Sequence, residues 1–542
     1  MLFNSYQFVC LFLPVVLAVC FVVSARFGAT AAQDWLALAS LFFYGVWNLQ
    51  FLPLLLGSIV FNYLIARAML AAPEDRRGPL MFAAIAVDLG LLGYYKYANY
   101  FVDTVDQVAG TGWTLGTILL PLGISFYTFQ QITLLVDISQ GRIERFRFRD
   151  FVLFVTFFPH LIAGPIVHHR EMMPQFEKAR YGYDPENLAV GFTLFAAGLF
   201  KKTVLADGMA GYVSPLFRAA NAGQPLGLLD AWAASVGFAL QMYFDFSGYS
   251  EMALGLARLF GIKLPMNFNS PLKATSVIDY WARWHITLTR FLTAYIYNPI
   301  AVSLTRRRMA AGRRGVAGAQ TTAGAFGMVV ALPTVTTMFL SGLWHGAGNQ
   351  YLVFGLLHGS YLVICHGWRL YRPLFWPDAA SYRRVMAPVG LVLTFCATAI
   401  ALTYFKADSV AAGSTVVAGM FGLHGVTLPS TFAALLPGLA QALGRAGVVF
   451  VPASLPALLL TYAWIGVLLG IVLALPNVLQ VMRDYQPALQ LPAANPAQAW
   501  LPRLMERLRW QPTPRWAMLT AAAGMLGFLT LGEVTEFLYW QF

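Results

Sequence analysis

Apolar stretches about as long as a membrane span recur from one end of the chain to the other, separated by short polar gaps. A helix needs about 20 apolar residues to cross the hydrocarbon core of a bilayer. In lipid, each segment must satisfy its own backbone N–H and C=O groups, so chains of this pattern fold as helices. The predicted spans are Phe8–Val23, Trp35–Trp47, Phe51–Ala66, Leu80–Tyr97, Leu115–Val136, Leu188–Leu205, Trp232–Phe246, Thr334–Leu343 with Tyr351–Cys365, Val385–Tyr404, Leu458–Leu475 and Trp516–Leu531.

The low content of charged residues supports the same fold class. Only 11% of the 542 residues are charged, whereas soluble domains carry about 25%. No long linker divides the chain, and no repeat of fixed period is visible. We therefore predict one all-α, polytopic integral membrane domain over residues 1–542.

Basic residues occur in the gaps between the predicted spans rather than along one face of a helix. The formal net charge of +12 therefore gives no reason to expect a nucleic-acid partner. The gap 102–114 has no Lys or Arg, whereas the next gap carries four arginines between Arg142 and Arg149. Such alternation follows the rule that positive loops stay in the cytoplasm. We predict that Arg142–Arg149 and Arg306–Arg314 share the cytoplasmic side and that Val102–Thr114 lies on the opposite side.

Two histidines 13 residues apart, His345 and His358, lie in the largely apolar run SGLWHGAGNQYLVFGLLHG. Ionisable residues inside a membrane are costly and usually functional, and histidine can act as a base near neutral pH. Three glycines interrupt the helical pattern around the first histidine: Gly342, Gly346 and Gly348. We expect His345 on a helix break that lines a cavity, with Trp344 and Asn349 nearby. The alternatives are an ordinary interfacial turn for His345 and a hydrogen bond between helices for His358.

A third histidine ends the aromatic run DYWARWH, residues 279–285. At helical spacing, Trp281, Trp284 and His285 share one face. Aromatic side chains flanking a histidine are typical of a lined tunnel. Tryptophans also gather at membrane interfaces, which is the alternative interpretation for these two.

The run YFDFSGYSE places a carboxylate, Asp245, at the end of an apolar stretch. A carboxylate at that depth must be paired or hydrated. We expect Asp245 or Ser247 to cap a helix that begins there, and we keep Asp245, Ser247 and Tyr249 as candidates for lining a substrate site. The run 158–165, FPHLIAGP, indicates a re-entrant loop, because Pro and Gly break a short apolar segment.

Metal-ligand spacing and phosphate-binding glycine loops are absent from the sequence. The four cysteines lie in apolar runs without paired spacing, so no disulfide framework or metal knuckle is predicted. We expect neither a metal nor a bound cofactor at the candidate site.

Together these runs resemble the membrane-bound O-acyltransferase family, in particular the bacterial branch that contains the alginate O-acetyltransferase membrane subunit. The matching runs occur in order along the whole chain: MLFNSYQFVCLFLP, FFPHLIAGPI, YFDFSGYSEMALGLARLFGIKLPMNFNSP, DYWARWHITLTRFL, SGLWHGAGNQYLVFGLLHG and FLYWQF. One departure concerns Thr293–Tyr297, where relatives carry an Arg-Asp pair. Any ion pair at those two positions is therefore absent. His160 also stands where glutamine is common.

The resemblance implies a ring of transmembrane and re-entrant helices around a central tunnel in the bacterial inner membrane. It implies acetyl-CoA as the cytoplasmic acyl donor. A periplasmic SGNH-hydrolase-like acetyltransferase would be the partner, and an exported polysaccharide the final acceptor. His345 would be the catalytic base that activates an acceptor hydroxyl, and His285 would orient the acyl group or stabilise developing charge. Acyl transfer needs both groups within a few ångströms, so we expect His285 and His345 to approach each other across one buried cavity. The alternative is that His285 only packs against a neighbouring helix.

Three other hypotheses stay open at this point. One is transfer of another acyl group, such as D-alanine from a carrier protein. Another is a proton-coupled transporter, because intramembrane His and Asp also suit proton relays. The last is a catalytically silent scaffold for the periplasmic transferase.

Overall fold

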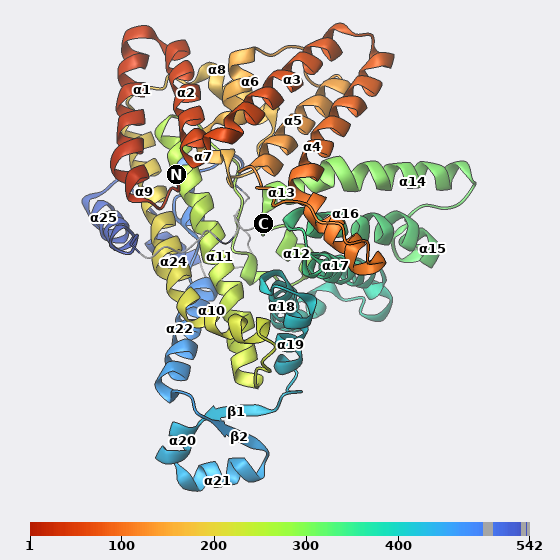
Figure 1. Cartoon of the computed structure of the whole chain (residues 1–542), viewed down its shortest axis with the longest axis vertical. Coiled ribbons are helices and arrows are strands. Elements are labelled where there is room, and N and C mark those ends of the chain that lie inside the picture. The colour runs from red at the N-terminus through yellow and green to blue at the C-terminus, as the bar shows by residue number, and fades with distance from the viewer. Residues whose placement is uncertain (492–501, 533–537, 539–542) are drawn as a thin grey trace. The chain divides into compact units, whose positions relative to one another are not determined.

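The computed structural model describes residues 1–491, 502–532 and 538, and its regular structure is almost entirely helical (Figure 1). The all-α, multi-pass membrane fold is thus confirmed. Apart from Leu538, the FLYWQF run lies outside the described residues. The chain divides into two compact units, the first formed by Met1–Thr203, Ser247–Asn267 and the described residues from Val478 onward, and the second by Val204–Phe246 and Phe268–Asn477. The expectation of one domain over residues 1–542 stays a prediction.

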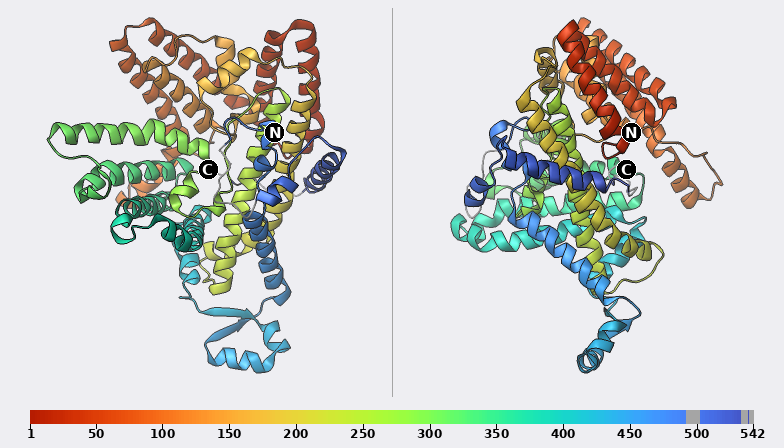
Figure 2. Two further views of the ribbon diagram at one scale, coloured as in Figure 1. Left: turned by 180° about the vertical axis from the view of Figure 1, so that it is seen from behind. Right: turned by 90° about the vertical axis from the view of Figure 1, so that its left-hand side faces the viewer.

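The first unit contains the N-terminal helices, of which α1 and α2 lie side by side in every view (Figure 1, Figure 2). Its helices are α1 (Leu13–Phe27), α2 (Ala29–Trp47), α3 (Leu52–Ala71), α4 (Glu74–Ala109), α5 (Ile124–Ser139), α6 (Phe148–Thr156), α7 (Phe158–Leu161), α8 (His169–Lys178), α9 (Pro185–Phe200), α23 (Val478–Val481), α24 (Pro502–Arg507) and α25 (Pro514–Leu529). Its core includes a cluster of phenylalanine rings from four segments: Phe3, Phe8, Phe43 and Phe158.

The second unit contains the three histidines singled out above. Its elements are α10 (Asp207–Asn221), α12 (Val277–Trp281), α13 (Ile286–Leu292), α14 (Asn298–Ala310), α15 (Ala323–Phe326), α16 (Leu332–His345), α17 (Asn349–Phe375), α18 (Ala379–Lys406), α19 (Val410–Met420), β1 (Val426–Pro429), α20 (Ser430–Leu435), α21 (Pro437–Arg445), β2 (Val448–Val451) and α22 (Leu455–Ala474). Helix α11 (Leu228–Leu259) contributes to both units, because the division falls between Phe246 and Ser247.

Seven helical segments of the described chain are long and apolar enough to cross a membrane. They are Gln7–Phe27, Leu49–Ala71, Glu74–Ala109, Pro185–Asn221, Ala323–His345, Ala379–Lys406 and Leu455–Tyr485. Large apolar side chains such as Leu11, Leu64 and Leu393 are exposed along them. In water this exposure would be unfavourable, whereas in a bilayer these side chains meet lipid.

Helix α11 corrects the predicted cap at Asp245 or Ser247. A single helix runs without interruption from Leu228 to Leu259, so no helix begins in the YFDFSGYSE run. The serine and glycine that suggested a boundary serve packing instead. A Cβ added to Gly248 would lie 2.7 Å from the Gly198 carbonyl oxygen, so only glycine lets the backbones of α11 and α9 approach this closely.

One other predicted boundary is revised. The predicted span Leu115–Val136 is helical only from Ile124, after Pro121 and a left-handed Gly123 (φ +67°). In the run FPHLIAGP only Phe158–Leu161 is helical, as the buried turn α7, which is too short to cross a bilayer. That the run is a re-entrant loop stays a prediction.

A small parallel sheet interrupts the helices of the second unit and was not predicted. Strands β1 and β2 pair from Val426 with Val448 to Pro429 with Val451, and α20 and α21 connect them. This sheet and its two helices project beyond the end of α22 (Figure 1, Figure 2). Strand β2 (VVFV) is apolar throughout, and periodicity cannot distinguish such a short apolar run from a piece of helix.

Labelling of single cysteines will test the predicted membrane topology. In a chain with the four native cysteines replaced, we expect an impermeant maleimide to label Thr104→Cys in intact spheroplasts, but not Arg145→Cys or Arg313→Cys. The physical reason is the retention of positive loops in the cytoplasm. All three positions should react after permeabilisation, which controls for accessibility. Labelling of Arg313→Cys in intact spheroplasts would contradict the assignment.

Candidate active site

His345 is the last residue of α16, and a short non-helical segment separates it from α17. The predicted break is therefore present, because Gly346 and Gly348 carry extended backbone between the two helices. A Cβ on Gly346 would lie 2.2 Å from the ring of Tyr351, so glycine is required for this ring to cover the break. Although it ends a helix, His345 is only 5% exposed.

The segment before His285 corrects the expectation of a shared helical face. Helix α12 ends at Trp281, and His285 has a left-handed backbone (φ +42°) before α13 begins at Ile286. Trp281 and His285 are therefore not on one continuous helix. A left-handed non-glycine residue is uncommon, and strained backbone of this kind persists only where surrounding contacts fix it.

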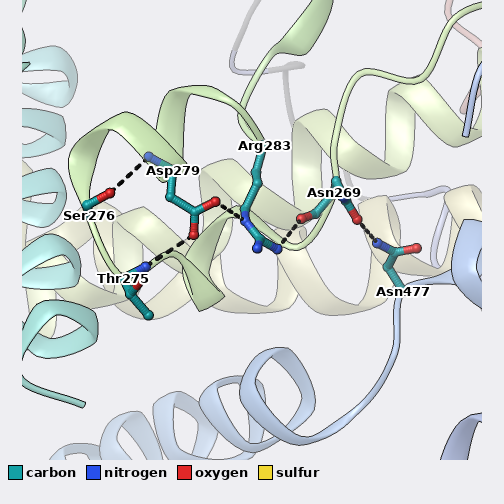
Figure 3. Close-up of polar contacts among 6 residues, drawn as sticks. All are labelled: Asn269, Thr275, Ser276, Asp279, Arg283 and Asn477. Atoms are coloured by element: carbon teal, nitrogen blue, oxygen red, sulfur yellow. Dashed lines mark hydrogen bonds and ion pairs between the residues drawn. The ribbon is translucent and has the colours of Figure 1, made fainter. Parts of the chain in front are cut away.

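A chain of polar contacts fixes this segment, as Figure 3 shows. The Asp279 carboxylate accepts hydrogen bonds from the Thr275 N–H (3.3 Å) and from Arg283 Nε (2.7 Å). The Arg283 guanidinium also donates to the Asn269 carbonyl (3.4 Å), and the Asn269 N–H donates back to the Arg283 carbonyl (2.9 Å). Asn477 Nδ2 reaches Asn269 Oδ1 (3.5 Å). These contacts join the segment at Arg283, two residues before His285, to the segment at Asn269.

The rings of His285 and His345 both contact Trp344. The centroid of the Trp344 ring lies 6.3 Å from that of His285 and 4.8 Å from that of His345. His285 is fully buried, with its ring edge-on to Phe246 (4.8 Å). His345 is enclosed by Phe405 (5.1 Å), among others. Residues 60 positions apart in sequence are therefore brought to one aromatic cluster.

Burial affects the charge state of His285, which lies outside the seven candidate spans. Removal from water lowers the pKa of His285 to about 3, because desolvation disfavours the imidazolium. The ring is therefore neutral at pH 7. A neutral imidazole donates one hydrogen bond and accepts another, but it provides no fixed positive charge.

His358 connects two helices. The indole Nε1 of Trp281 donates a hydrogen bond to His358 Nδ1 (3.2 Å), and the His358 ring stacks on Tyr280 (6.1 Å, 6°). The alternative of a hydrogen bond between helices is therefore present for His358, which accepts it on α17 from Trp281 of α12. Because Nδ1 accepts, a neutral His358 carries its proton on Nε2.

The remaining candidates are distributed more widely. Trp284 is buried and stacks on Tyr280 (5.6 Å, 12°), within the same aromatic cluster. Asn349 is exposed at the first position of α17. Asp245 is buried in α11 within the second unit. Ser247 and Tyr249 belong to the first unit, where Tyr249 stacks on Phe3 (4.8 Å).

Two residues near the histidines, Arg283 and Phe405, were not identified as candidates from the sequence. Arg283 had a detectable signal, since Asp279 and Arg283 are four residues apart, the spacing of a helical ion pair. Phe405, which encloses His345 from α18, had none. A phenylalanine in an apolar helix looks the same whether it faces lipid or a site.

Comparisons with known proteins establish the family. A model of the membrane-bound O-acyltransferase (MBOAT) family matches residues 139–311. Over 456 residues the chain is 36% identical to the peptidoglycan O-acetyltransferase of Helicobacter pylori, covering 79% of this chain and 81% of that protein. The chain belongs to the membrane-bound O-acyltransferase family.

Other relatives of this MBOAT protein are named for different substrates. The probable alginate O-acetylase AlgI of Pseudomonas aeruginosa is 35% identical over 81% of this chain and 78% of its own length. The teichoic acid D-alanyltransferase of Bacillus subtilis is 26% identical over 51% of this chain and 65% of its own length. The protein is thus an O-acyltransferase, as predicted. His285 lies inside the matched residues 139–311, and His345 lies beyond them.

Arg283 gives this MBOAT site a testable positioning residue. We expect Arg283→Ala to lower kcat for acyl transfer about tenfold or more with little change in KM, because a displaced His285 loses its alignment rather than its affinity for the donor. Kinetics of the purified variant, with Tm measured alongside, provide the check. Arg283→Lys should recover part of the loss, since its ammonium can still pair with Asp279.

The exposed Arg384→Ala on α18 serves as the control and should retain wild-type kcat. If Arg283→Ala keeps both kcat and Tm, the contacts in Figure 3 have no positioning role.

Proposed function

We propose that this protein is an inner-membrane O-acetyltransferase that takes acetyl groups from cytoplasmic acetyl-CoA for the O-acetylation of an exported polysaccharide. The observation that carries the proposal is the similarity over most of the chain to proteins named for O-acetylation of peptidoglycan and alginate. A periplasmic SGNH-hydrolase-like acetyltransferase is the proposed partner. The proposed acceptor class is an exopolysaccharide such as alginate or cellulose.

In the proposed reaction, His345 acts as general base. It removes the proton from an acceptor hydroxyl, whose oxygen attacks the thioester carbonyl carbon of acetyl-CoA. The carbon–sulfur bond then breaks, an ester forms, and the proton passes from His345 to the departing thiolate. No net proton is released.

His285 is the proposed partner in orienting the acyl group, with a proton on one ring nitrogen available to the developing oxyanion. The shared contact with Trp344 supports a common site for the two histidines. Burial of both rings supports a water-poor site, in which such hydrogen bonds are stronger.

Transfer of D-alanine is the second candidate, and the similarity to a teichoic acid D-alanyltransferase favours it specifically. The transporter and silent-scaffold hypotheses gain no support from relatives that are named as acyltransferases or acetylases.

Purified protein in lipid nanodiscs, supplied with acetyl-labelled acetyl-CoA, tests the proposal. We expect release of free CoA thiol and of labelled acetate or ester, at a rate far above that of empty nanodiscs. A parallel reaction contains D-alanine loaded on a carrier protein. Turnover of the D-alanyl carrier with none of acetyl-CoA would select the second candidate, and turnover of neither would overturn both.

A further inference from the structure

The first unit holds a group of buried polar side chains that the proposed reaction does not use. They come from four helices: Tyr44 of α2, Ser58 and Asn62 of α3, Asp88 of α4, and Tyr127 and Gln131 of α5. None is more than 8% exposed. Helices α3 and α4 belong to candidate spans, and α5 packs against both. Ser58, Asn62 and Asp88 therefore lie in candidate membrane spans.

Hydrogen bonds connect the centre of this group. Asn62 Nδ2 donates to Asp88 Oδ1 (2.9 Å) and to Gln131 Oε1 (3.1 Å). The Ser58 hydroxyl also donates to Gln131 Oε1 (2.8 Å). These bonds hold three helices together and aim the Asp88 carboxylate at the amide of Asn62.

Four oxygen atoms of the same group have no hydrogen-bond partner among the described residues. They are Asp88 Oδ2, Asn62 Oδ1 and the hydroxyl oxygens of Tyr44 and Tyr127. Tyr127 lies four residues before Gln131 on the same face of α5, and its electrostatic interactions with Tyr44 and Asp88 support the same grouping. Buried polar atoms are almost always satisfied in native proteins. Several unsatisfied oxygens in one place therefore indicate an occupant.

The charge of Asp88 restricts what that occupant is. Within the described chain, Asp88 forms no ion pair with a lysine, arginine or histidine, and Asn62 is its only hydrogen-bond donor. An uncompensated carboxylate at membrane depth is very costly. A monovalent cation would neutralise it, whereas a divalent cation would leave an excess positive charge in the same position.

We propose that Asp88 and the neighbouring open oxygens bind a small monovalent cation between α2, α3, α4 and α5. Carboxylate, amide and hydroxyl oxygens are the ligands that hard cations prefer. The ion would satisfy the four open oxygens and the charge of Asp88 together. Gln131 Nε2, also without a partner, is a donor and would bind a water molecule beside the ion. The proposal is independent of the acyl-transfer chemistry.

Thermal unfolding of the full-length protein in detergent tests the proposal. Tm is measured while NaCl replaces choline chloride at constant ionic strength, with KCl in a second series. We expect a saturable rise in Tm of about 2 °C for Na⁺ or K⁺ in the wild-type protein, because a ligand that binds only the folded state stabilises it. Asp88→Asn should abolish the rise, since it removes the charge and keeps the side-chain size.

Two further variants make the result specific. Tyr127→Phe removes one open oxygen and should shift the midpoint of the cation titration several-fold upward. Asp34→Asn removes an exposed carboxylate of the same unit, paired with Arg149 (2.5 Å), and should leave the titration unchanged. An unchanged wild-type Tm in Na⁺, K⁺ and choline would overturn the proposal, as a proton would then neutralise Asp88. If Asp88→Asn does not fold, the wild-type and Tyr127→Phe titrations decide.

Discussion

His345→Ala is expected to reduce acetyl transfer by a factor of about 100 to 10,000, while the protein still inserts into the membrane and folds. Loss of a general base typically has an effect of this size. The structure supplies a reason for intact folding, because His345 is the last residue of α16 and its replacement leaves the preceding turns of this helix unchanged. Release of CoA thiol by the purified variant, normalised to protein, is the measurement.

A second histidine provides the matched control. His366 lies on α17, away from the aromatic cluster, and His366→Ala should retain wild-type turnover. Comparable Tm values for the two variants would show that the loss in His345→Ala is chemical. Wild-type acetyl release by a well-folded His345→Ala variant would remove this histidine from the mechanism.

Gly355→Ala is expected to disrupt the same site from a distance. A Cβ on Gly355 of α17 would lie 2.4 Å from the Met338 carbonyl oxygen and 3.1 Å from the Gly342 Cα, both on α16. Overpacking of this kind costs about 1–3 kcal/mol, against about 1 kcal/mol that alanine gains over glycine in a helix. Because Gly342 precedes His345 by less than one turn, separation of the helices should also lower turnover. Tm and kcat are measured together.

Gly466→Ala separates this effect from the general consequences of replacing a helical glycine. Gly466 lies in α22 of the same unit, and no atom lies within 4 Å of a Cβ added there. We expect its Tm to stay equal or to rise slightly, with full turnover. Equal Tm and turnover for Gly355→Ala and wild type would show that α16 and α17 tolerate a wider separation.

The sequence was sufficient to predict the class of fold and to select the individual histidines as candidate site residues. A membrane leaves helices as the main way to satisfy the backbone, so long apolar stretches predict the fold class without any tertiary information. The break after His345 was equally visible, since closely spaced glycines interrupt a helix whatever surrounds it. The family resemblance rested on the same local runs.

Boundaries inside apolar helices were not determined by the sequence. The YFDFSGYSE run contains residues that favour caps, yet α11 continues through it. Close packing of Gly248 against Gly198 decides that outcome, and these residues lie 50 positions apart. Local propensity is weaker than such packing, so a cap signal in an apolar run is an unreliable guide.

The contacts that group these residues were decided by the tertiary structure. Trp344 contacts both His285 and His345 because the left-handed turn at His285 and the end of α16 meet. The oxygens around Asp88 come from four helices, and only their packing shows that they share one buried position. Sequence determines which side chains are costly to bury in a membrane, whereas the fold determines which of them are buried together.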